Sequence, residues 1–248
     1  MRAWPYYGKV YIGGDDMAEP TYSVEKKCPV CEQTFSVTRT RGRQVMDKQD
    51  SDFCAHFKDI NPYYYTIWVC SNCGYAAADS YFEDLFVAAK DKIAKFLSTR
   101  KVNVNYSGER TRDQAIATYK LAIFFADMIA APASRLAELY LRLAWLYREG
   151  ENQEEEKTAL LKACEYYEQA LMRERLPIGS LSEAAVSYLI GELARRSGQN
   201  EKALLYLSKV VGNPATKLEP RVLSLARDAW HEARDARDQA AAAVTDGD

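Results

Sequence analysis

Two Cys-x-x-Cys pairs constrain this chain more than any other feature of its sequence. They are Cys28-Pro-Val-Cys31 and Cys70-Ser-Asn-Cys73. Four cysteine thiolates can close a tetrahedral zinc site and leave no coordination position open. Hydrolytic zinc keeps a water molecule, so a saturated site is structural. We therefore expect Cys28, Cys31, Cys70 and Cys73 to bind a structural Zn²⁺ ion.

The same four cysteines allow two interpretations other than a zinc site. A single Cys-x-x-Cys pair is also typical of a redox dithiol, but two matched pairs beside predicted strands favour a metal. Four thiolates can also bind an iron–sulfur cluster, so the sequence leaves iron open as the metal. The remaining cysteines, Cys54 and Cys164, are unpaired in the sequence pattern, which fits a reducing compartment.

Composition places the chain among ordinary globular proteins. Its 248 residues allow one large domain or two small ones, and 48% of them are hydrophobic. A net charge of −2 gives no basic footprint for nucleic acid or anionic lipid. We find no apolar run near the roughly 18 residues that span a bilayer, and no secretory signal after Met1. We expect a cytoplasmic protein without a membrane interaction.

Residues 21–79 are predicted to form a small β domain of the zinc-ribbon type. The segment 34–40 alternates apolar and polar residues, and the segment 65–69 is rich in aromatic and β-branched residues. Each Cys-x-x-Cys pair would then occupy a tight turn beside a strand. Gly74 follows the second pair directly, where such a turn often needs a positive φ.

The long spacer between the two pairs predicts an insertion in this domain. We place an inserted lobe at about residues 41–64, which contains Asp50-Ser-Asp-Phe-Cys54 and Asn61-Pro62. Residues 1–20 are predicted to be an irregular N-terminal segment. Residues 244–248 are predicted to be a flexible tail.

Residues 80–243 are predicted to be helical, which makes the fold class α+β and mostly α. Apolar residues recur at helical spacing and are interrupted by Gly and Pro. The expected helices cover residues 81–97, 112–131, 134–149, 153–175, 181–197, 201–211 and 220–243.

Paired helices suggest a repeat of about 34 residues. Gly191 and Ala203 are small residues that allow two helices to approach, and Leu207 would fill the gap beside them. An earlier copy runs from Tyr140 to Ala170 with a longer turn. This rhythm of small and large residues resembles the tetratricopeptide repeat, whose stacked pairs form a concave groove that binds peptides.

The chain also resembles an uncharacterised bacterial family over about residues 24–215. That family, a domain of unknown function, joins a zinc-ribbon-like N-terminus to tetratricopeptide-like helices. The resemblance implies this architecture and a bacterial cytoplasmic origin, and it carries no established activity. The matching segments are Cys28-Pro-Val-Cys31, Asp50-Ser-Asp-Phe-Cys54, Asn61-Pro62, Ile67-Trp-Val-Cys70, Asn72-Cys-Gly-Tyr75 and Leu141-Arg-Leu-Ala-Trp-Leu-Tyr-Arg148.

A second group of reactive residues lies in the inserted lobe. Asp50, Asp52, Cys54 and His56 fall within seven residues, and alternate positions of a strand share a face. Asp52, Cys54 and His56 could therefore form a metal site or a nucleophilic Cys–His pair. We favour a structural cluster, in which Phe53 and Cys54 are buried and the aspartates cap turns.

Arg39, Arg41 and Arg43 alternate near a strand end in a domain rich in aromatic residues, as in zinc ribbons that bind nucleic acid. Residues 1–79 nonetheless contain nine Lys and Arg against ten Asp and Glu. We expect these arginines to pair with the thiolate-rich site and nearby aspartates. Nucleic-acid binding through the ribbon is the alternative function.

The sequence favours recognition over catalysis. We expect an adaptor or scaffold that binds a protein or peptide partner through the helical groove, with no catalytic residues and no small-molecule substrate. Catalysis by Cys54 and His56 is the third hypothesis, but it would need an oxyanion hole and a substrate pocket.

Overall fold

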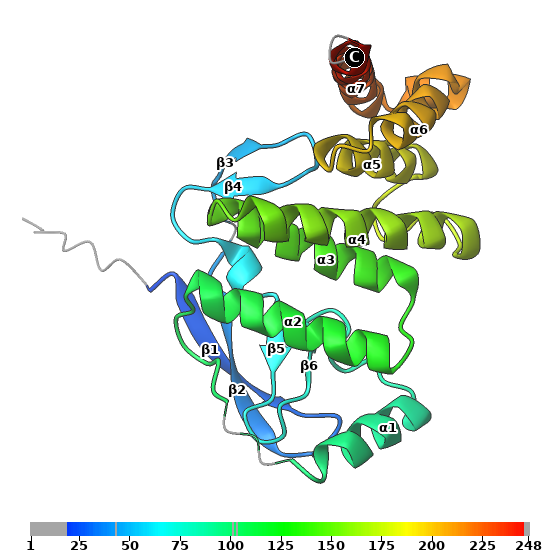
Figure 1. Cartoon of the computed structure of the whole chain (residues 1–248). Coiled ribbons are helices and arrows are strands. Elements are labelled where there is room, and N and C mark those ends of the chain that lie inside the picture. The colour runs from blue at the N-terminus through cyan, green and yellow to red at the C-terminus, as the bar shows by residue number, and fades with distance from the viewer. Residues whose placement is uncertain (1–18, 43, 101, 103, 246–248) are drawn as a thin grey trace, which may run out of the picture.

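The computed structural model of the chain describes residues 19–42, 44–100, 102 and 104–245, and it confirms the expected α+β, mostly helical class. Three antiparallel hairpins precede and flank a stack of helices (Figure 1). The strands are β1 (Thr21–Lys27), β2 (Thr34–Thr40), β3 (Met46–Gln49), β4 (Ala55–Phe57), β5 (Ile67–Val69) and β6 (Ala76–Ala78). The α-helices are α1 (Val87–Leu97), α2 (Arg112–Met128), α3 (Ala133–Glu149), α4 (Gln153–Arg173), α5 (Glu183–Arg196), α6 (Asn200–Gly212) and α7 (Pro220–Thr245).

Each Cys-x-x-Cys pair lies in the turn of its own hairpin. β1 pairs with β2 around the first pair, with Val24 opposite Val37, and β5 pairs with β6 around the second. On β2, Phe35 and Val37 are buried, as the alternating pattern of residues 34–40 predicts. The β5 strand is shorter than expected because residues 62–65 form a 3₁₀ turn, η1.

The prediction of a first helix over residues 81–97 is wrong at its start. Residues 81–85 form turns, and α1 begins only at Val87. Phe82 is fully buried, and its ring lies 5.4 Å from Phe35 and 5.0 Å from Tyr75. Phe82 is thus buried against the hairpins of residues 21–79, which we call the β module. This burial favours a compact turn over a regular helix at that point.

From α2 onward the helices stack in sequence order along the molecule, each against the next (Figure 1). Helix α1 contacts α2 through the rings of Phe96, Phe124 and Phe125. The predicted close approach of α5 and α6 is confirmed. A Cβ atom on Gly191 would lie 2.7 Å from Cγ of Leu207 and 3.4 Å from the carbonyl oxygen of Ala203. Only a residue without a side chain fits there, so this pair of helices is held at short range.

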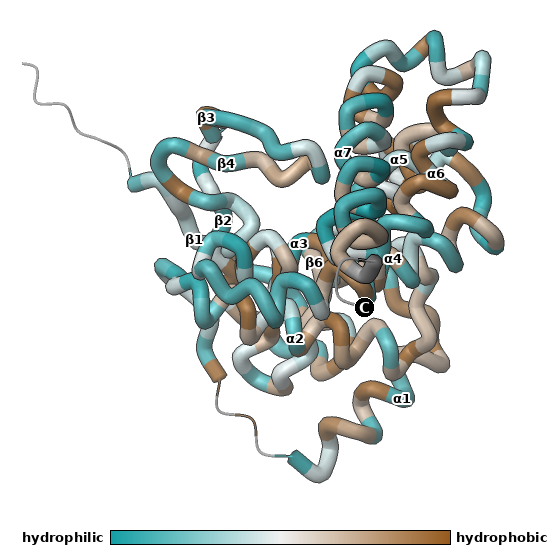
Figure 2. The backbone as a smooth tube through the Cα atoms, turned by 45° about the horizontal axis from the view of Figure 1, so that its top comes forward, coloured by the Kyte–Doolittle hydropathy of each residue, from teal (hydrophilic) through white to brown (hydrophobic). Residues whose placement is uncertain are grey.

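The last helix covers the end of the stack. Ala226, Ala229 and Ala233 are buried, whereas the rest of α7 is mostly hydrophilic in Figure 2. The helix extends to Thr245, and residues 246–248 of the expected tail lie outside the described residues. The expected irregular segment 1–20 also lies almost wholly outside them.

A buried arginine connects the β module to the helices. The Arg110 side chain is 5% exposed and donates hydrogen bonds to the carbonyl oxygens of Tyr64, Ile67 and Tyr106 at 2.8–2.9 Å. Burial lowers the pKa of Arg110 to about 10. The hydrophobic core is continuous from Cys28 to Ala233, across the boundary drawn at residues 79 and 80.

Candidate metal centre

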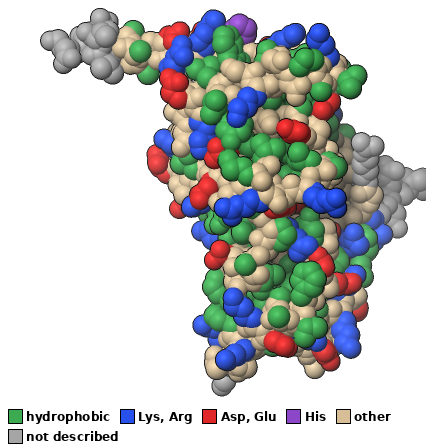
Figure 3. Space-filling view, turned by 90° about the vertical axis from the view of Figure 1, so that its right-hand side faces the viewer, with side chains coloured by type: hydrophobic (Ala, Val, Ile, Leu, Met, Phe, Trp, Pro, Cys, Tyr) green, Lys and Arg blue, Asp and Glu red, His purple; other side chains and the backbone are tan. Residues whose placement is uncertain are grey.

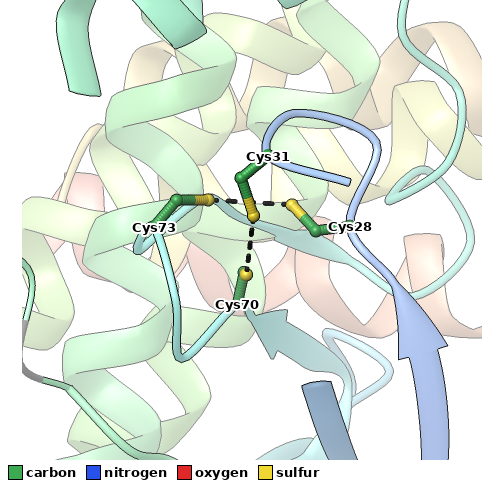
Figure 4. A group of neighbouring side chains, drawn as sticks. All are labelled: Cys28, Cys31, Cys70 and Cys73. Carbon is green, nitrogen blue, oxygen red and sulfur yellow. Dashed lines mark hydrogen bonds between the residues drawn. The ribbon is translucent and has the colours of Figure 1, made fainter. Parts of the chain in front are cut away.

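The four predicted ligands lie together. Cys28 and Cys31 come from the β1–β2 turn, Cys70 and Cys73 come from the β5–β6 turn, and their sulfur atoms point toward one another (Figure 4). The Sγ atoms of Cys28 and Cys73 are 3.7 Å apart, as are those of Cys31 and Cys70. Residues from two separate hairpins therefore form one cluster.

These distances suit a shared ion. In a tetrahedral site with metal–sulfur bonds of about 2.3 Å, neighbouring sulfur atoms lie about 3.8 Å apart. The observed 3.7 Å matches this spacing. It is far longer than the roughly 2.05 Å of a disulfide bond. The cluster is thus able to bind a metal ion through all four sulfur atoms.

The two cysteine turns have the same backbone construction. The carbonyl oxygen of Cys28 accepts from N–H of Glu32 at 2.9 Å, and that of Cys70 accepts from N–H of Gly74 at 2.8 Å. Glu32 and Gly74 both have a positive φ, 62° and 82°. The predicted positive φ at Gly74 is confirmed. The equivalent turn carries Glu32, a residue type for which the same backbone is strained.

Hydrogen bonds within the cluster shift the pKa values of Cys28, Cys70 and Cys73 in different directions. Hydrogen bonds with Cys28 and Cys73 lower the pKa of Cys70. The hydrogen bond to Cys70 raises the pKa of Cys28, and the hydrogen bond with Cys28 raises the pKa of Cys73. A second thiolate is disfavoured beside the first unless a cation offsets the charge, which is the role of a bound metal.

The inserted lobe contains a second convergent group, although not the one expected. Asp50, Cys54 and His56 each place one possible ligand atom within 4.8 Å of the others. Nε2 of His56 lies 2.8 Å from Oδ2 of Asp50. The alternative in which Asp52 joins Cys54 and His56 is not what the structure shows, since the Asp52 carboxylate binds Arg148 of α3. As the favoured interpretation expects, Cys54 is buried and Oδ1 of Asp52 accepts a hydrogen bond from N–H of Cys54 at 3.3 Å within the turn.

Asp52 connects the lobe to α3 through side-chain hydrogen bonds. Its fully buried carboxylate accepts hydrogen bonds from Nη2 of Arg148 at 2.6 Å and from Nε1 of Trp145 at 3.1 Å. Next to it, Oγ of Ser51 donates to Glu192 of α5 at 2.6 Å, and Ser51 also accepts from Nη2 of Arg196 at 2.8 Å. The turn between β3 and β4 is therefore bound to two helices at once.

Sequence comparison assigns the chain to a family. Residues 21–233 match the model described as "Uncharacterized protein conserved in bacteria (DUF2225)". The chain belongs to this family. No curated protein and no solved structure gives a significant match. Membership covers the four clustered cysteines, the β3–β4 turn and most of the helical stack, but it assigns none of them a function.

None of the helices in the described residues combines the length and apolar content that a membrane crossing requires. On the face shown in Figure 3, acidic and basic side chains are interspersed with hydrophobic ones and do not separate by sign. That face therefore shows no broad basic surface of the kind that binds a phosphate backbone.

The arginines of the β module contact aromatic rings. The Arg39 guanidinium lies 5.8 Å from the Trp68 ring centroid, and that of Arg41 lies 5.3 Å from the Tyr22 ring. Arg41 also donates to the carbonyl oxygen of Glu19. The expected pairing of these two arginines with thiolates or aspartates is thus replaced by cation–π contacts. Arg43 lies outside the described residues.

The lobe lies against α3 and α5, to which Asp52 and Ser51 bind. Beside it remains a cavity of about 370 Å³ between the lobe and the helices. Phe53 and Tyr63 line it from the lobe, Leu141 and Trp145 from α3, and Leu189 from α5. The lobe and the helices therefore both line this cavity.

Two site residues were not singled out from the sequence. Arg148 was named only as the last residue of the segment 141–148, and Arg110 lies between the helices expected over residues 81–97 and 112–131. Arg110 is buried and the Arg148 side chain is 17% exposed, and both bind partners from distant segments. A charged residue at the end of a buried helical stripe is the only local signal of Arg148.

Proposed function

We propose that this chain is a cytoplasmic, zinc-stabilised adaptor that binds a protein or peptide segment through its helical part. The four-cysteine cluster would bind a structural Zn²⁺ ion and so connect the two cysteine hairpins. The helices would act as a tetratricopeptide-like array. The close contact of Gly191 with Leu207 and Ala203, the packing on which that likeness rests, supports this proposal.

The cavity between the lobe and the helices is the observation that carries the proposal. Pockets that bind ligands usually occupy about 300–1,000 Å³, so 370 Å³ suits one aromatic or branched side chain of a partner. Its walls combine aromatic and aliphatic side chains with charged and hydroxyl side chains, so an apolar group of a partner would lie beside polar ones. We infer that an apolar anchor residue of the partner enters this cavity.

Charged groups at the cavity indicate what kind of residues should flank the apolar anchor in the partner. Glu138 and Arg142 form an ion pair in its wall, and Glu174 and Arg175 also line it. Because acidic and basic side chains are present in equal number, the cavity offers no net electrostatic attraction to a strongly acidic or strongly basic partner. We therefore propose a segment with an apolar anchor flanked by polar or mixed-charge residues.

The proposal is tested with a partner recovered from the native host and then purified. Ser180→Trp places a large side chain at an exposed residue of the cavity lining. Ser224→Trp makes the same change at an exposed position of α7 outside that lining. We expect Ser180→Trp to weaken binding at least tenfold and Ser224→Trp to leave the dissociation constant unchanged.

Two results would oppose the adaptor proposal. One is that a folded full-length bait, used at native concentration, recovers no protein partner. The other is that Ser180→Trp binds the purified partner as tightly as the unaltered chain. Circular dichroism of both variants is the control that the fold is kept.

Nucleic-acid binding through the β module is the second candidate, because Lys26 and Arg39 lie over the Trp68 ring and Arg41 over the half-exposed Tyr22 ring. Trp68 itself is buried, which leaves Tyr22 as the ring able to stack on a base. Salt-sensitive binding of DNA or RNA that Arg39→Ala and Arg41→Ala weaken would support this function. Lack of binding at low salt would remove it.

An enzyme is the least supported alternative. Burial raises the pKa of the Cys54 thiol to about 12, whereas a catalytic thiol needs a lowered pKa. Full function of a Cys54→Ser variant, measured as partner binding, would agree with a non-catalytic role for this residue.

A further inference from the structure

We propose that Asp50, Cys54 and His56 form a second metal site, separate from the four-cysteine cluster. The site would bind a divalent transition metal of the zinc type. It does not depend on the adaptor function, because it rests only on the geometry and charge of the β3–β4 turn.

The ligand atoms are already close to coordination distance. All three lie within 4.8 Å of one another, and Nε2 of His56 is 2.8 Å from Oδ2 of Asp50. Nitrogen and oxygen ligands at about 2.0–2.1 Å from a tetrahedral ion lie about 3.3 Å apart, so the pair needs to separate by about 0.5 Å. A side-chain torsion adjustment of that size needs no movement of the strands.

The backbone holds the turn in this shape. N–H of Asp50 donates to the carbonyl oxygen of Cys54 at 2.8 Å, and N–H of Phe53 donates to that of Asp50 at 3.0 Å. Phe53 has a φ of 68°, a strained value for an aromatic residue. The side chain of Gln49 also donates to the Phe53 carbonyl oxygen at 3.1 Å. Strain of this kind concentrates at functional turns.

The charge around the turn favours a cation. Three carboxylates share the single guanidinium of Arg148: Asp50 at 3.0 Å, Asp52 at 2.6 Å and Glu156 at 2.7 Å. Lys48 lies farther away, with its Nζ 4.0 Å from Oδ1 of Asp50. Arg196, the other cation that acts on Asp52 and Cys54, is itself paired with Glu192 at 2.7 Å. The three carboxylates around Arg148 therefore exceed the cations Arg148 and Lys48 by one charge. A divalent ion would offset it together with the charge of the Cys54 thiolate, whose proton goes to solvent on binding.

The ligand types select the metal. One sulfur, one imidazole nitrogen and one carboxylate oxygen form a mixed set that suits Zn²⁺, whereas Mg²⁺ and Ca²⁺ prefer oxygen ligands alone. Three protein ligands leave one position of a tetrahedral ion for a water molecule or another ligand. This is the chemical difference from the saturated four-cysteine cluster.

Metal stoichiometry tests the proposal directly. The full-length chain, reduced and stripped of metal under anaerobic conditions, is titrated with Zn²⁺ and in parallel with Co²⁺, whose absorption reports the ligand set. We expect two equivalents for the unaltered chain and one for His56→Ala. The matched control is Cys164→Ser, a buried cysteine outside both clusters, which should still bind two.

The two sites should also differ in the Co²⁺ spectrum. His56→Ala and Asp50→Asn should keep the strong sulfur charge-transfer absorption of the four-cysteine site and lose only the weaker component. Circular dichroism checks that each variant is folded. A single equivalent in the unaltered chain, or two equivalents in both folded variants, would overturn the proposal.

Discussion

Asp52 and Arg148 are 96 residues apart in sequence, yet Nη2 of Arg148 lies 2.6 Å from Oδ2 of Asp52. The Asp52 carboxylate is fully buried and the guanidinium is mostly so. Burial is the largest single influence and would raise the pKa of Asp52, but the hydrogen bonds and charge of Arg148, the charge of Arg196 and the hydrogen bond from Trp145 together outweigh it and lower the pKa. This pair makes the β3–β4 turn part of the helical stack rather than a loose insertion.

Removing the Asp52 carboxylate should destabilise the protein strongly. Asp52→Ala leaves Trp145 Nε1 without its acceptor and deprives Arg148 of its closest partner. Breaking a buried pair of this kind costs about 3 kcal/mol. Urea unfolding measures the loss, and Asp59→Ala, at an exposed aspartate of the same lobe, is the control that should stay close to the unaltered chain. Equal stability of both variants would show that the pair does not hold the lobe.

The pair should also make stability depend on pH. The pKa of Asp52 is lower in the folded chain than its unfolded value of about 3.9. Its contribution is therefore complete above that value and is lost as the pH falls through the folded pKa. We expect the stability gap between the unaltered chain and Asp52→Ala to be widest at neutral pH and to narrow toward about pH 3. A gap that widens on acidification would contradict the assignment.

Gly191 should tolerate no side chain. A Cβ atom there would lie 2.7 Å from Leu207, and overpacking costs about 1–3 kcal/mol, partly offset by the better helix propensity of Ala. We expect Gly191→Ala to lower the unfolding free energy by about 1 kcal/mol and Gly191→Val to lower it further. Gly212→Ala is the matched control, because nothing lies within 4 Å of its added Cβ. In thermal unfolding, Gly212→Ala should be the most stable of the three variants, followed by Gly191→Ala and then Gly191→Val.

The second cysteine turn should depend on Gly74. Its φ is +82°, and an added Cβ would lie 3.0 Å from a methyl group of Val102. Gly42 also has a positive φ of +62°, but nothing lies within 4 Å of its Cβ. Both Ala variants place a side chain on a residue with positive φ and so share the backbone strain. A difference in Zn²⁺ release between them therefore reports on the cysteine turn that contains Gly74. We expect only Gly74→Ala to release Zn²⁺ at a clearly lower chelator concentration.

Local patterns predicted much of this fold. The spacing of Cys28, Cys31, Cys70 and Cys73 was enough to predict their cluster because ligand spacing is set by the metal. The β2 strand matched its expected bounds because residues 34–40 alternate with one buried face. Most helices matched within a few residues because Gly and Pro mark their ends.

Long-range partners could not be predicted in the same way. The carboxylate of Asp52 binds Arg148 of a distant helix and N–H of Cys54, and it does not join the possible ligand atoms of Cys54 and His56. The short strand β6 consists of three alanines and has no strand signal of its own; it forms because β5 pairs with it. The late start of α1 depends on the burial of Phe82 by three other aromatic rings. In each case tertiary contacts outweighed local preference.

We propose that an ion held by four thiolates connects the two cysteine hairpins and keeps residues 21–79 folded against the helices. The most direct measurement is the metal content of the purified, reduced chain, followed by complete chelation monitored by hydrogen exchange. We predict at least one bound Zn²⁺ per chain that Cys28→Ser removes, and loss of protection in residues 21–79 while most helical protection persists. A metal-free chain with fully protected cysteine hairpins would contradict the claim.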